Sequence, residues 1–193
     1  MPKPSHRETI LTEGLRVVLE RGFRGASVRD VVQAAGVPQG SFTNHFASKE
    51  AFGLEILDLY FAQVREGIQK TLRSDSLPPL DRLRAWLDLQ TRFLKKAEMR
   101  SGCLIGNFSI EAADHSEAIR RRLVEIFDEI QQSIAYCLRA AVKARQLRPA
   151  TNYEELASFL YSSLQGAILQ AKAERSAIPL ERFKKFLFST VLR

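Results

Sequence analysis

The stretch that decides the fold is SVRDVVQAAGVPQGSFTNHF, residues 27–46. It reads as a short helix, a turn that contains Gly36, and a second short helix rich in small polar side chains. Ser27 can cap the first of these helices, and Gly36 can end it as a C-cap glycine. The second helix is expected from about residue 38 to residue 45. This order predicts a helix-turn-helix, in which the second helix enters the major groove of DNA.

The second short helix carries side chains that are short or planar enough to reach base edges. Asn and Gln can pair bidentately with adenine, Ser and Thr can reach either strand, and glycine permits close approach of the backbone. The candidate base-contacting residues are Gln39, Gly40, Ser41, Thr43, Asn44 and His45. For His45 and Phe46, packing against neighbouring helices is the alternative role.

Three further residues are expected at helix N-termini that face phosphates, namely Ser27, Arg29 and Lys49. Backbone N–H groups and the helix dipole favour an anion at such ends. These residues would position the protein on the duplex without reading its sequence.

Apolar residues at three- and four-residue spacing predict helices throughout the chain. Ser5 and Glu8 form a capping box for a first helix that ends at Gly22, and a long helix runs from Lys49 to about Arg73. After a boundary at residues 74–80, the expected helices are 80–98, 103–113, 116–146, 152–175 and 179–192. The fold class is therefore all-α, with about nine helices.

The net charge of +7 in 193 residues favours polyanionic partners only weakly, since residues 1–50 carry seven Lys/Arg against five Asp/Glu. No apolar run is long enough to cross a bilayer and no secretory signal opens the chain, so we expect a cytoplasmic protein without a membrane partner. The two cysteines, Cys103 and Cys137, are expected to be free thiols.

The run GFRGASVRDVVQAAGVPQGSFTNHFASKEAFG, residues 22–53, resembles the DNA-binding signature of the TetR family. The resemblance implies a three-helix DNA-binding head over residues 1–48 and a helical effector-binding and dimerisation domain over residues 49–193. It further implies a homodimer, a double-stranded DNA operator and a small-molecule effector. One position departs from the family pattern: Thr43 stands where the family usually has a phosphate-contacting tyrosine, which leaves its role open.

Two further segments, SGCLIGNFSIEAAD (101–114) and LQGAILQAKAERS (164–176), resemble a sub-branch of NemR- and AcuR-like regulators. This resemblance implies an effector that is a small reactive electrophile or oxidant, or an unsaturated acid. A cysteine and a lysine at the positions of Cys103 and Lys172 are characteristic of the sub-branch.

Cys103 stands where a helix is expected to begin, and the N–H groups and dipole of that end would stabilise its thiolate. Lys172 is the candidate cationic neighbour. The alternative is a buried structural cysteine, because free cysteine is among the most buried residue types. Cys137 lies in the middle of a predicted helix, where inert packing is expected.

Three predicted helices could bring mixed polar and apolar faces together around a pocket, as is common between the helices of a bundle. The candidate effector-binding residues are Trp86, Gln90, Phe93, Cys103, Asn107, Tyr161, Gln165 and Lys172. For each aromatic residue, ordinary core packing is the alternative.

Three alternatives to an electrophile-sensing repressor are a repressor with non-covalent sensing, an enzyme, and a helical interaction scaffold. No nucleophile-base motif, phosphate loop or metal signature is present, so we expect no catalytic residue, no metal and no cofactor. The acidic residues and histidine around position 114 are interpreted as caps and solvated charges. The family resemblance further predicts that the helices 152–175 and 179–192 of two chains form a four-helix bundle.

Overall fold

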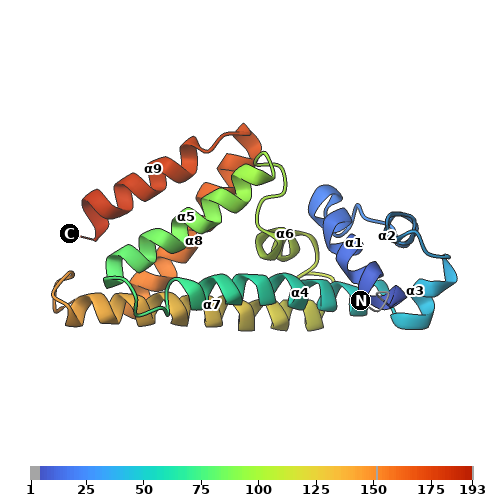
Figure 1. The fold of residues 1–193 in the computed structure, drawn as a ribbon, viewed down its shortest axis with the longest axis horizontal. Helices are drawn as coiled ribbons and strands as arrows, with labels where there is room; N and C mark the ends of the chain where they lie inside the picture. The colour runs from blue at the N-terminus through green and yellow to red at the C-terminus, as the bar shows by residue number, and fades with distance from the viewer. Residues whose placement is uncertain (1–4, 151, 193) are drawn as a thin grey trace. The chain divides into compact units, whose positions relative to one another are not determined.

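The computed structural model describes residues 5–150 and 152–192, and this part of the chain is helical with no β-strand (Figure 1). The helices confirm the predicted all-α fold. They are α1 (His6–Arg21), α2 (Val28–Ala35), α3 (Gly40–His45), α4 (Lys49–Lys70), α5 (Pro79–Lys96), α6 (Leu104–Glu111), α7 (Glu117–Lys143), α8 (Tyr153–Glu174) and α9 (Ile178–Phe186), followed by a π-helical turn, Leu187–Val191. The predicted domain limits at residues 1 and 193 lie outside the described residues.

The described part of the chain divides into two compact units. Unit 1 comprises the described part of Met1–Gln63 together with Leu104–Glu125, and unit 2 comprises Val64–Cys103 with the described part of Ile126–Arg193. Helices α4 and α7 each contribute residues to both units. Helix α6 belongs to unit 1, although the chain reaches it from unit 2.

Local hydrogen bonds fix the start of the first two helices in unit 1. The Ser5 hydroxyl accepts from the Glu8 N–H at 3.2 Å, and the Glu8 carboxylate accepts from the Ser5 N–H at 3.0 Å. Ser27 and Asp30 form the same reciprocal pair at the start of α2, and Gly36 ends that helix in the left-handed region, at φ 64°. Both predicted caps are confirmed. In each, a short polar side chain accepts from a backbone N–H group that has no partner within the helix.

An apolar core joins α1, α2 and α3 of unit 1. Helix α1 packs on α2, and α3 packs on both of them. Phe42 of α3 is 3% exposed, and its ring centroid lies 5.1 Å from that of Phe46 and 5.3 Å from that of Phe52 in α4. A helix as short as α3 is not stable alone, so this aromatic cluster holds it in place.

The last residue of α6 contacts the turn between α1 and α2. Gly22 has φ 77° and ψ 162°, a region that essentially only glycine populates. A Cβ atom there would lie 2.7 Å from Oε1 of Glu111, the last residue of α6. Oε2 of the same carboxylate accepts a hydrogen bond from the Arg24 backbone N–H at 2.9 Å. Glu111 therefore ties the end of α6 to the turn that leads into the predicted helix-turn-helix.

Unit 2 is a bundle in which α8 packs on α9. Its buried residues include Trp86 and Leu87 of α5 and Leu160 and Leu164 of α8. The last predicted helix, 179–192, changes character along its length, because α9 ends at Phe186 and the chain continues as a π-helical turn. In that turn the Phe188 ring lies 3.9 Å from the guanidinium carbon of Arg84 in α5.

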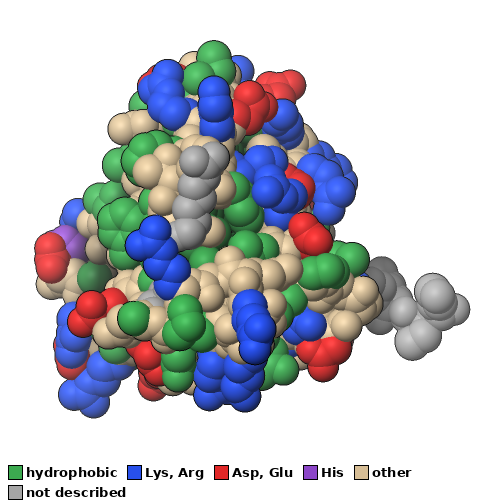
Figure 2. Space-filling model, turned by 90° about the vertical axis from the view of Figure 1, so that its left-hand side faces the viewer, with side chains coloured by type: hydrophobic (Ala, Val, Ile, Leu, Met, Phe, Trp, Pro, Cys, Tyr) green, Lys and Arg blue, Asp and Glu red, His purple; other side chains and the backbone are tan. Residues whose placement is uncertain are grey.

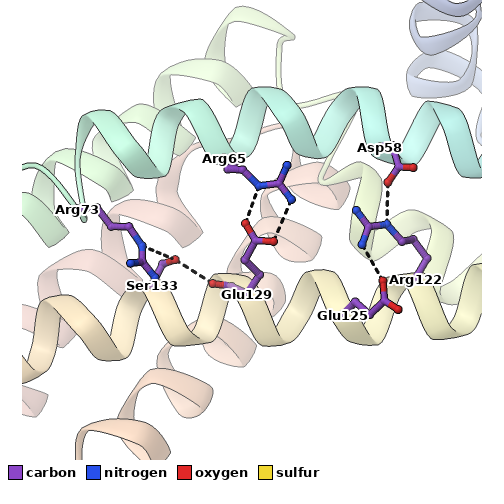
Figure 3. A network of polar contacts seen from close by, with 7 residues as sticks. All are labelled: Asp58, Arg65, Arg73, Arg122, Glu125, Glu129 and Ser133. Atoms are coloured by element: carbon purple, nitrogen blue, oxygen red, sulfur yellow. Dashed lines mark hydrogen bonds and ion pairs between the residues drawn. The ribbon is translucent and has the colours of Figure 1, made fainter.

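Polar side chains link α4 and α7 within each unit (Figure 3). In unit 2, the Arg65 guanidinium donates to both carboxylate oxygens of Glu129, at 2.6 and 2.9 Å. In unit 1, Arg122 of α7 donates to Asp58 of α4 and to Glu125, each at 2.7 Å. Exposed pairs of this kind contribute at most about 1 kcal/mol each, so their main effect is on the register of the two helices.

The surface carries interspersed charges. Figure 2 shows one face on which basic, acidic and apolar side chains alternate without a continuous field of one sign. Among the described residues, no helix is both long and apolar enough to span a membrane. The same part of the chain holds no group of three or more His, Cys, Asp or Glu side chains that could bind a metal ion.

Gly22 lies in the turn before α2 and Gly36 ends that helix, and their replacement by alanine gives a first testable prediction. Gly36→Ala is expected to lower the free energy of unfolding by about 1–2 kcal/mol, the cost of a left-handed conformation for a residue with a Cβ. No atom lies within 4 Å of the added Cβ at Gly36. Gly22→Ala is expected to cost more, because it adds the collision with Glu111 to a less accessible backbone conformation.

Urea denaturation of both variants measures this difference, and a double-mutant cycle with Glu111→Ala isolates the contact. The cycle is expected to show non-additive losses at Gly22 and additive losses at Gly36. Equal losses for the two glycine variants would contradict the described fit of Glu111 over the turn.

Candidate DNA-binding surface and effector site

Helix α3 displays most of the predicted base-contacting residues. Its inner face is fixed by Phe42, so the other face is left toward solvent. The exposed predicted residues are Gln39, Gly40, Thr43, Asn44 and His45. The Thr43 hydroxyl donates to the Gly40 carbonyl at 3.0 Å, which leaves its oxygen available as an acceptor. Helix α3 begins at Gly40 rather than at residue 38, because the Pro38–Gln39 segment forms only a preceding turn.

Ser41 differs from this exposed set. It is only 9% exposed and lies beside Phe42, on the side of α3 that packs against the rest of unit 1. A hydroxyl with this burial has little surface to offer a base, so the expected role of Ser41 in base contact is not favoured by its position.

The three predicted phosphate-facing residues have different surroundings. Ser27 and Arg29 are exposed at the start of α2. The Ser27 hydroxyl is held in the cap, where it donates to the Asp30 carboxylate at 2.6 Å. The same hydrogen bond is the largest cause of a lowered pKa at Asp30, so this carboxylate stays ionised as the helix cap.

Lys49 is held inside unit 1 more tightly than its sequence position suggested. Its ammonium donates to the Arg24 carbonyl at 3.3 Å and lies 5.0 Å from the centroid of the Phe23 ring. Burial lowers the pKa of this ammonium, and the carboxylates of Glu111 and Asp30 offset part of the fall. Lys49 and Glu111 therefore hold the α1–α2 turn from α4 and α6.

Sequence reasoning did not identify Glu111 as a positioning residue. Its hydrogen-bond partner is the Arg24 backbone N–H, and the space beside its carboxylate is open only because residue 22 has no Cβ. A backbone N–H carries no sequence pattern of its own. The only available signal was the glycine at position 22, which requires an unusual backbone conformation.

In unit 2, two of the predicted effector-site residues, Gln165 and Tyr161, lie next to a third, Cys103. This residue lies directly before α6 and is half-buried. The Gln165 side-chain amide of α8 donates to the Cys103 sulfur at 3.5 Å. Tyr161 lies one turn earlier on α8 and is 5% exposed. Its phenol has a pKa well above the usual value, chiefly because of burial and secondly because of the charge of Cys103. Its ring also packs on Phe127 of α7, with centroids 6.0 Å apart.

The remaining predicted effector-site residues differ in their exposure. Trp86 of α5 is 1% exposed, and its indole N–H has no hydrogen-bond partner. Gln90 is half-buried, whereas Phe93 is exposed, so Phe93 is not part of the core. Lys172 is half-buried in the last turn of α8. Asn107 is half-buried in α6 and belongs to unit 1.

Cys137 has the inert surroundings that the sequence predicted. It is fully buried in α7, and its sulfur donates to the Pro79 carbonyl at 3.1 Å. Burial raises the pKa of this thiol to about 11 from the ordinary value of 9.0. Because the thiolate is the nucleophile, such a thiol reacts slowly at neutral pH.

The two cysteines should therefore react at very different rates. Iodoacetamide at neutral pH is expected to label Cys103 of the folded protein and to leave Cys137 unmodified, as mapped by peptide mass spectrometry. The raised pKa means that labelling of Cys137 should increase as the pH rises toward 11. Unfolding in urea should make both thiols reactive. Equal labelling of the two thiols in the folded protein at neutral pH would show that burial does not protect Cys137.

Comparison with known proteins agrees with this arrangement. Residues 10–56 match the model of bacterial regulatory proteins of the tetR family, and residues 79–187 match the tetracyclin repressor-like C-terminal domain. The HTH-type transcriptional repressor DhaR of Mycobacterium sp. (strain GP1) is 38% identical over 192 residues, which cover 100% of this chain and 95% of DhaR. The HTH-type transcriptional repressor NemR of Escherichia coli K12 is 31% identical, over 91% of this chain and 88% of NemR.

Solved structures give the same result. The reduced form of E. coli NemR superimposes with a TM-score of 0.83 at 31% identity, covering 92% of each chain. A regulatory protein TetR from Rhodobacter sphaeroides superimposes with a TM-score of 0.89 at 28% identity, covering 93% of this chain and 95% of that one. With family models matched at both ends, this chain belongs to the TetR family of transcriptional regulators, which are DNA-binding proteins and not enzymes.

Proposed function

We propose that this protein is a transcriptional repressor that is released from a palindromic operator by a small effector. The observation that carries the proposal is the outer face of α3, where Gln39, Thr43 and Asn44 are exposed while Phe42 anchors the helix from within. Their donor and acceptor groups suit base edges in the major groove. Repression, rather than activation, is supported by the relatives DhaR and NemR, both of which are named as repressors.

The division of labour follows the family pattern. Residues 1–48 act as the DNA-binding head, and residues 49–193 bind the effector and form the dimer. Large apolar side chains are exposed on the last two helices, as a surface that pairs with a second copy would require. They are Phe159 and Leu169 of α8 and Ile178 and Phe186 of α9. A dimer through this surface would present two recognition helices to half-sites about one DNA turn, ~34–36 Å, apart.

The effector acts at Cys103, where a small electrophile forms a covalent bond with the sulfur. The half-buried position of this residue directly before α6 supports the proposal, because its sulfur is not enclosed in the core as that of Cys137 is. The hydrogen bond from Gln165 further supports it, since an amide N–H donor stabilises negative charge on sulfur. Lys172 of the same helix as Gln165 supplies positive charge to this end of unit 2.

The signal from Cys103 to the head runs through α6. That helix begins at the residue after Cys103 and ends at Glu111, whose carboxylate holds the turn at Gly22 and Arg24. An effector can release DNA only if it favours a state in which the head fits the operator less well. A shift of α6 on modification of Cys103 provides such a state, because the head turn would move with Glu111.

The DNA-binding proposal is tested by selecting duplexes from a random library. The selected sequences are expected to contain a palindrome, with binding that weakens steeply as salt is raised. Asn44→Ala is expected to weaken binding to the selected duplex by about 1–3 kcal/mol, the range for one bidentate base contact. Binding to an unrelated duplex should change little, because that contact is made only to the correct base. Fluorescence anisotropy measures both affinities.

Gln33→Ala is the matched control for Asn44→Ala, since Gln33 is an exposed amide of α2, outside the recognition helix. It should leave the affinity for the selected duplex near that of the parent protein. Salt-independent binding, or selected duplexes without a common sequence, would rule out the repressor and favour a scaffold role.

The sensing proposal is tested with Cys103→Ser. This variant is expected to bind the selected duplex as tightly as the parent and to remain bound when N-ethylmaleimide is added, because the attacking sulfur is absent. The parent protein and a Cys137→Ser control should both dissociate under the same treatment. Dissociation of the Cys103→Ser variant would remove cysteine chemistry from the mechanism and leave a repressor with non-covalent sensing.

A further inference from the structure

The hydroxyl of Tyr161 is a buried polar group of unit 2. Tyr161 is 5% exposed, and its oxygen has no hydrogen-bond partner of normal geometry. The neighbouring Gln165 side chain acts to lower the pKa of the phenol, and its amide N–H also donates to the Cys103 sulfur at 3.5 Å. A buried hydroxyl without a partner reduces stability, and a phenylalanine would fill the same space without that cost.

The orphaned hydroxyl lies beside the candidate sensing sulfur. Cys103 acts electrostatically on the phenol, and both groups border Gln165, so a sulfur nucleophile and an O–H donor occur at the same site. Negative charge on Cys103 favours the protonated phenol, which is the form that donates a hydrogen bond. A molecule at this site could therefore meet a nucleophile and a hydrogen-bond donor at once.

We propose that Tyr161 is a ligand-binding residue whose hydroxyl donates to a carbonyl oxygen of the effector. The effector class that fits is an α,β-unsaturated carbonyl compound, in which the electrophilic carbon and the acceptor oxygen belong to one conjugated group. This inference rests on the proposed sensing function of Cys103. It adds a second residue and a chemical requirement on the effector.

The bonding changes balance without a further reagent. The Cys103 thiol first loses its proton to solvent, and the thiolate adds to the β-carbon to form a C–S bond. The electron pair of the C=C bond moves toward the carbonyl, so negative charge develops on the oxygen of an enolate. The Tyr161 O–H hydrogen-bonds that oxygen while it carries the charge, and water then delivers a proton to the α-carbon. The net reaction is addition of S–H across the double bond.

The experiment compares two small thiol reagents on the full-length protein. Methyl vinyl ketone has the carbonyl oxygen, whereas methyl methanethiosulfonate modifies thiols by disulfide exchange and has no carbonyl group. Intact-protein mass spectrometry follows the rate of modification, and Cys103→Ser identifies the reacting residue. In Tyr161→Phe, methyl vinyl ketone is expected to react about a hundredfold to a thousandfold more slowly, as when a donor to a developing oxyanion is removed. The rate with the thiosulfonate should stay within about twofold of the parent rate, since no oxyanion of that kind forms.

Tyr136→Phe is the matched control, because Tyr136 belongs to the same unit and its ring packs under Arg73 and Arg139. It should leave both rates unchanged. The melting temperature of Tyr161→Phe is expected to equal or exceed that of the parent, because an unpartnered buried hydroxyl has been removed.

The outcomes separate the two proposals. If neither reagent modifies Cys103 of the parent protein, the sensing function of that cysteine fails. If Cys103 reacts but Tyr161→Phe slows neither reagent, or slows both equally, the role of Tyr161 is overturned while the sensing proposal stands. A lower melting temperature for Tyr161→Phe would show that the hydroxyl is structural and would overturn the inference as well.

Discussion

The anchoring of α3 by one aromatic side chain is the constraint on which the DNA-binding surface depends. Helix α3 spans only Gly40–His45, too short to persist through its own hydrogen bonds. Phe42, packed against Phe46 and Phe52, fixes both its position and its rotation. The rotation matters most, because it places Ser41 toward the protein and Asn44 toward solvent. The burial of Phe42 thus determines which side chains of α3 face the DNA.

The same head depends on a second contact, which has a different chemical nature. The turn before α2 adopts a backbone conformation that only glycine tolerates, and it is held by hydrogen bonds to the Arg24 backbone from Glu111 and Lys49. Apolar packing tolerates small shifts, whereas hydrogen bonds weaken steeply with geometry. A carboxylate at the end of α6 is therefore well suited to sense a small displacement of that helix. The residue at the other end of α6, Leu104, follows Cys103 directly in the chain.

Unit 2 combines buried polar groups that are costly for stability with two thiols of different exposure. Tyr161 and Trp86 keep buried polar atoms without partners, and each such atom costs about 1–3 kcal/mol in a folded protein. Cys137, in contrast, is packed and hydrogen-bonded, and its raised pKa keeps it unreactive. The two cysteines thus differ through their surroundings alone.

The sequence by itself determined the features that depend on neighbours along the chain. The capping boxes at Ser5 and Ser27, the C-cap at Gly36 and the order of the helices follow from residues within one or two turns of each other. Predicted helix ends such as Arg73 and Gln146 extended beyond the observed ends at Lys70 and Lys143, because the last residues of a helix leave it in turns that spacing does not reveal.

Only the tertiary structure decided which side chains meet across the chain. Ser41 and Asn44 of α3 both have small polar side chains by sequence, yet the packing of Phe42 leaves Ser41 buried and Asn44 exposed. Lys49 has the sequence position of a phosphate ligand, but the fold places its ammonium on Phe23 and the Arg24 carbonyl. The link between Gln165 and Cys103 joins residues that are distant in sequence. Local spacing fixes a helix and its faces, whereas burial and hydrogen-bond partners depend on elements that the chain brings together only when it folds.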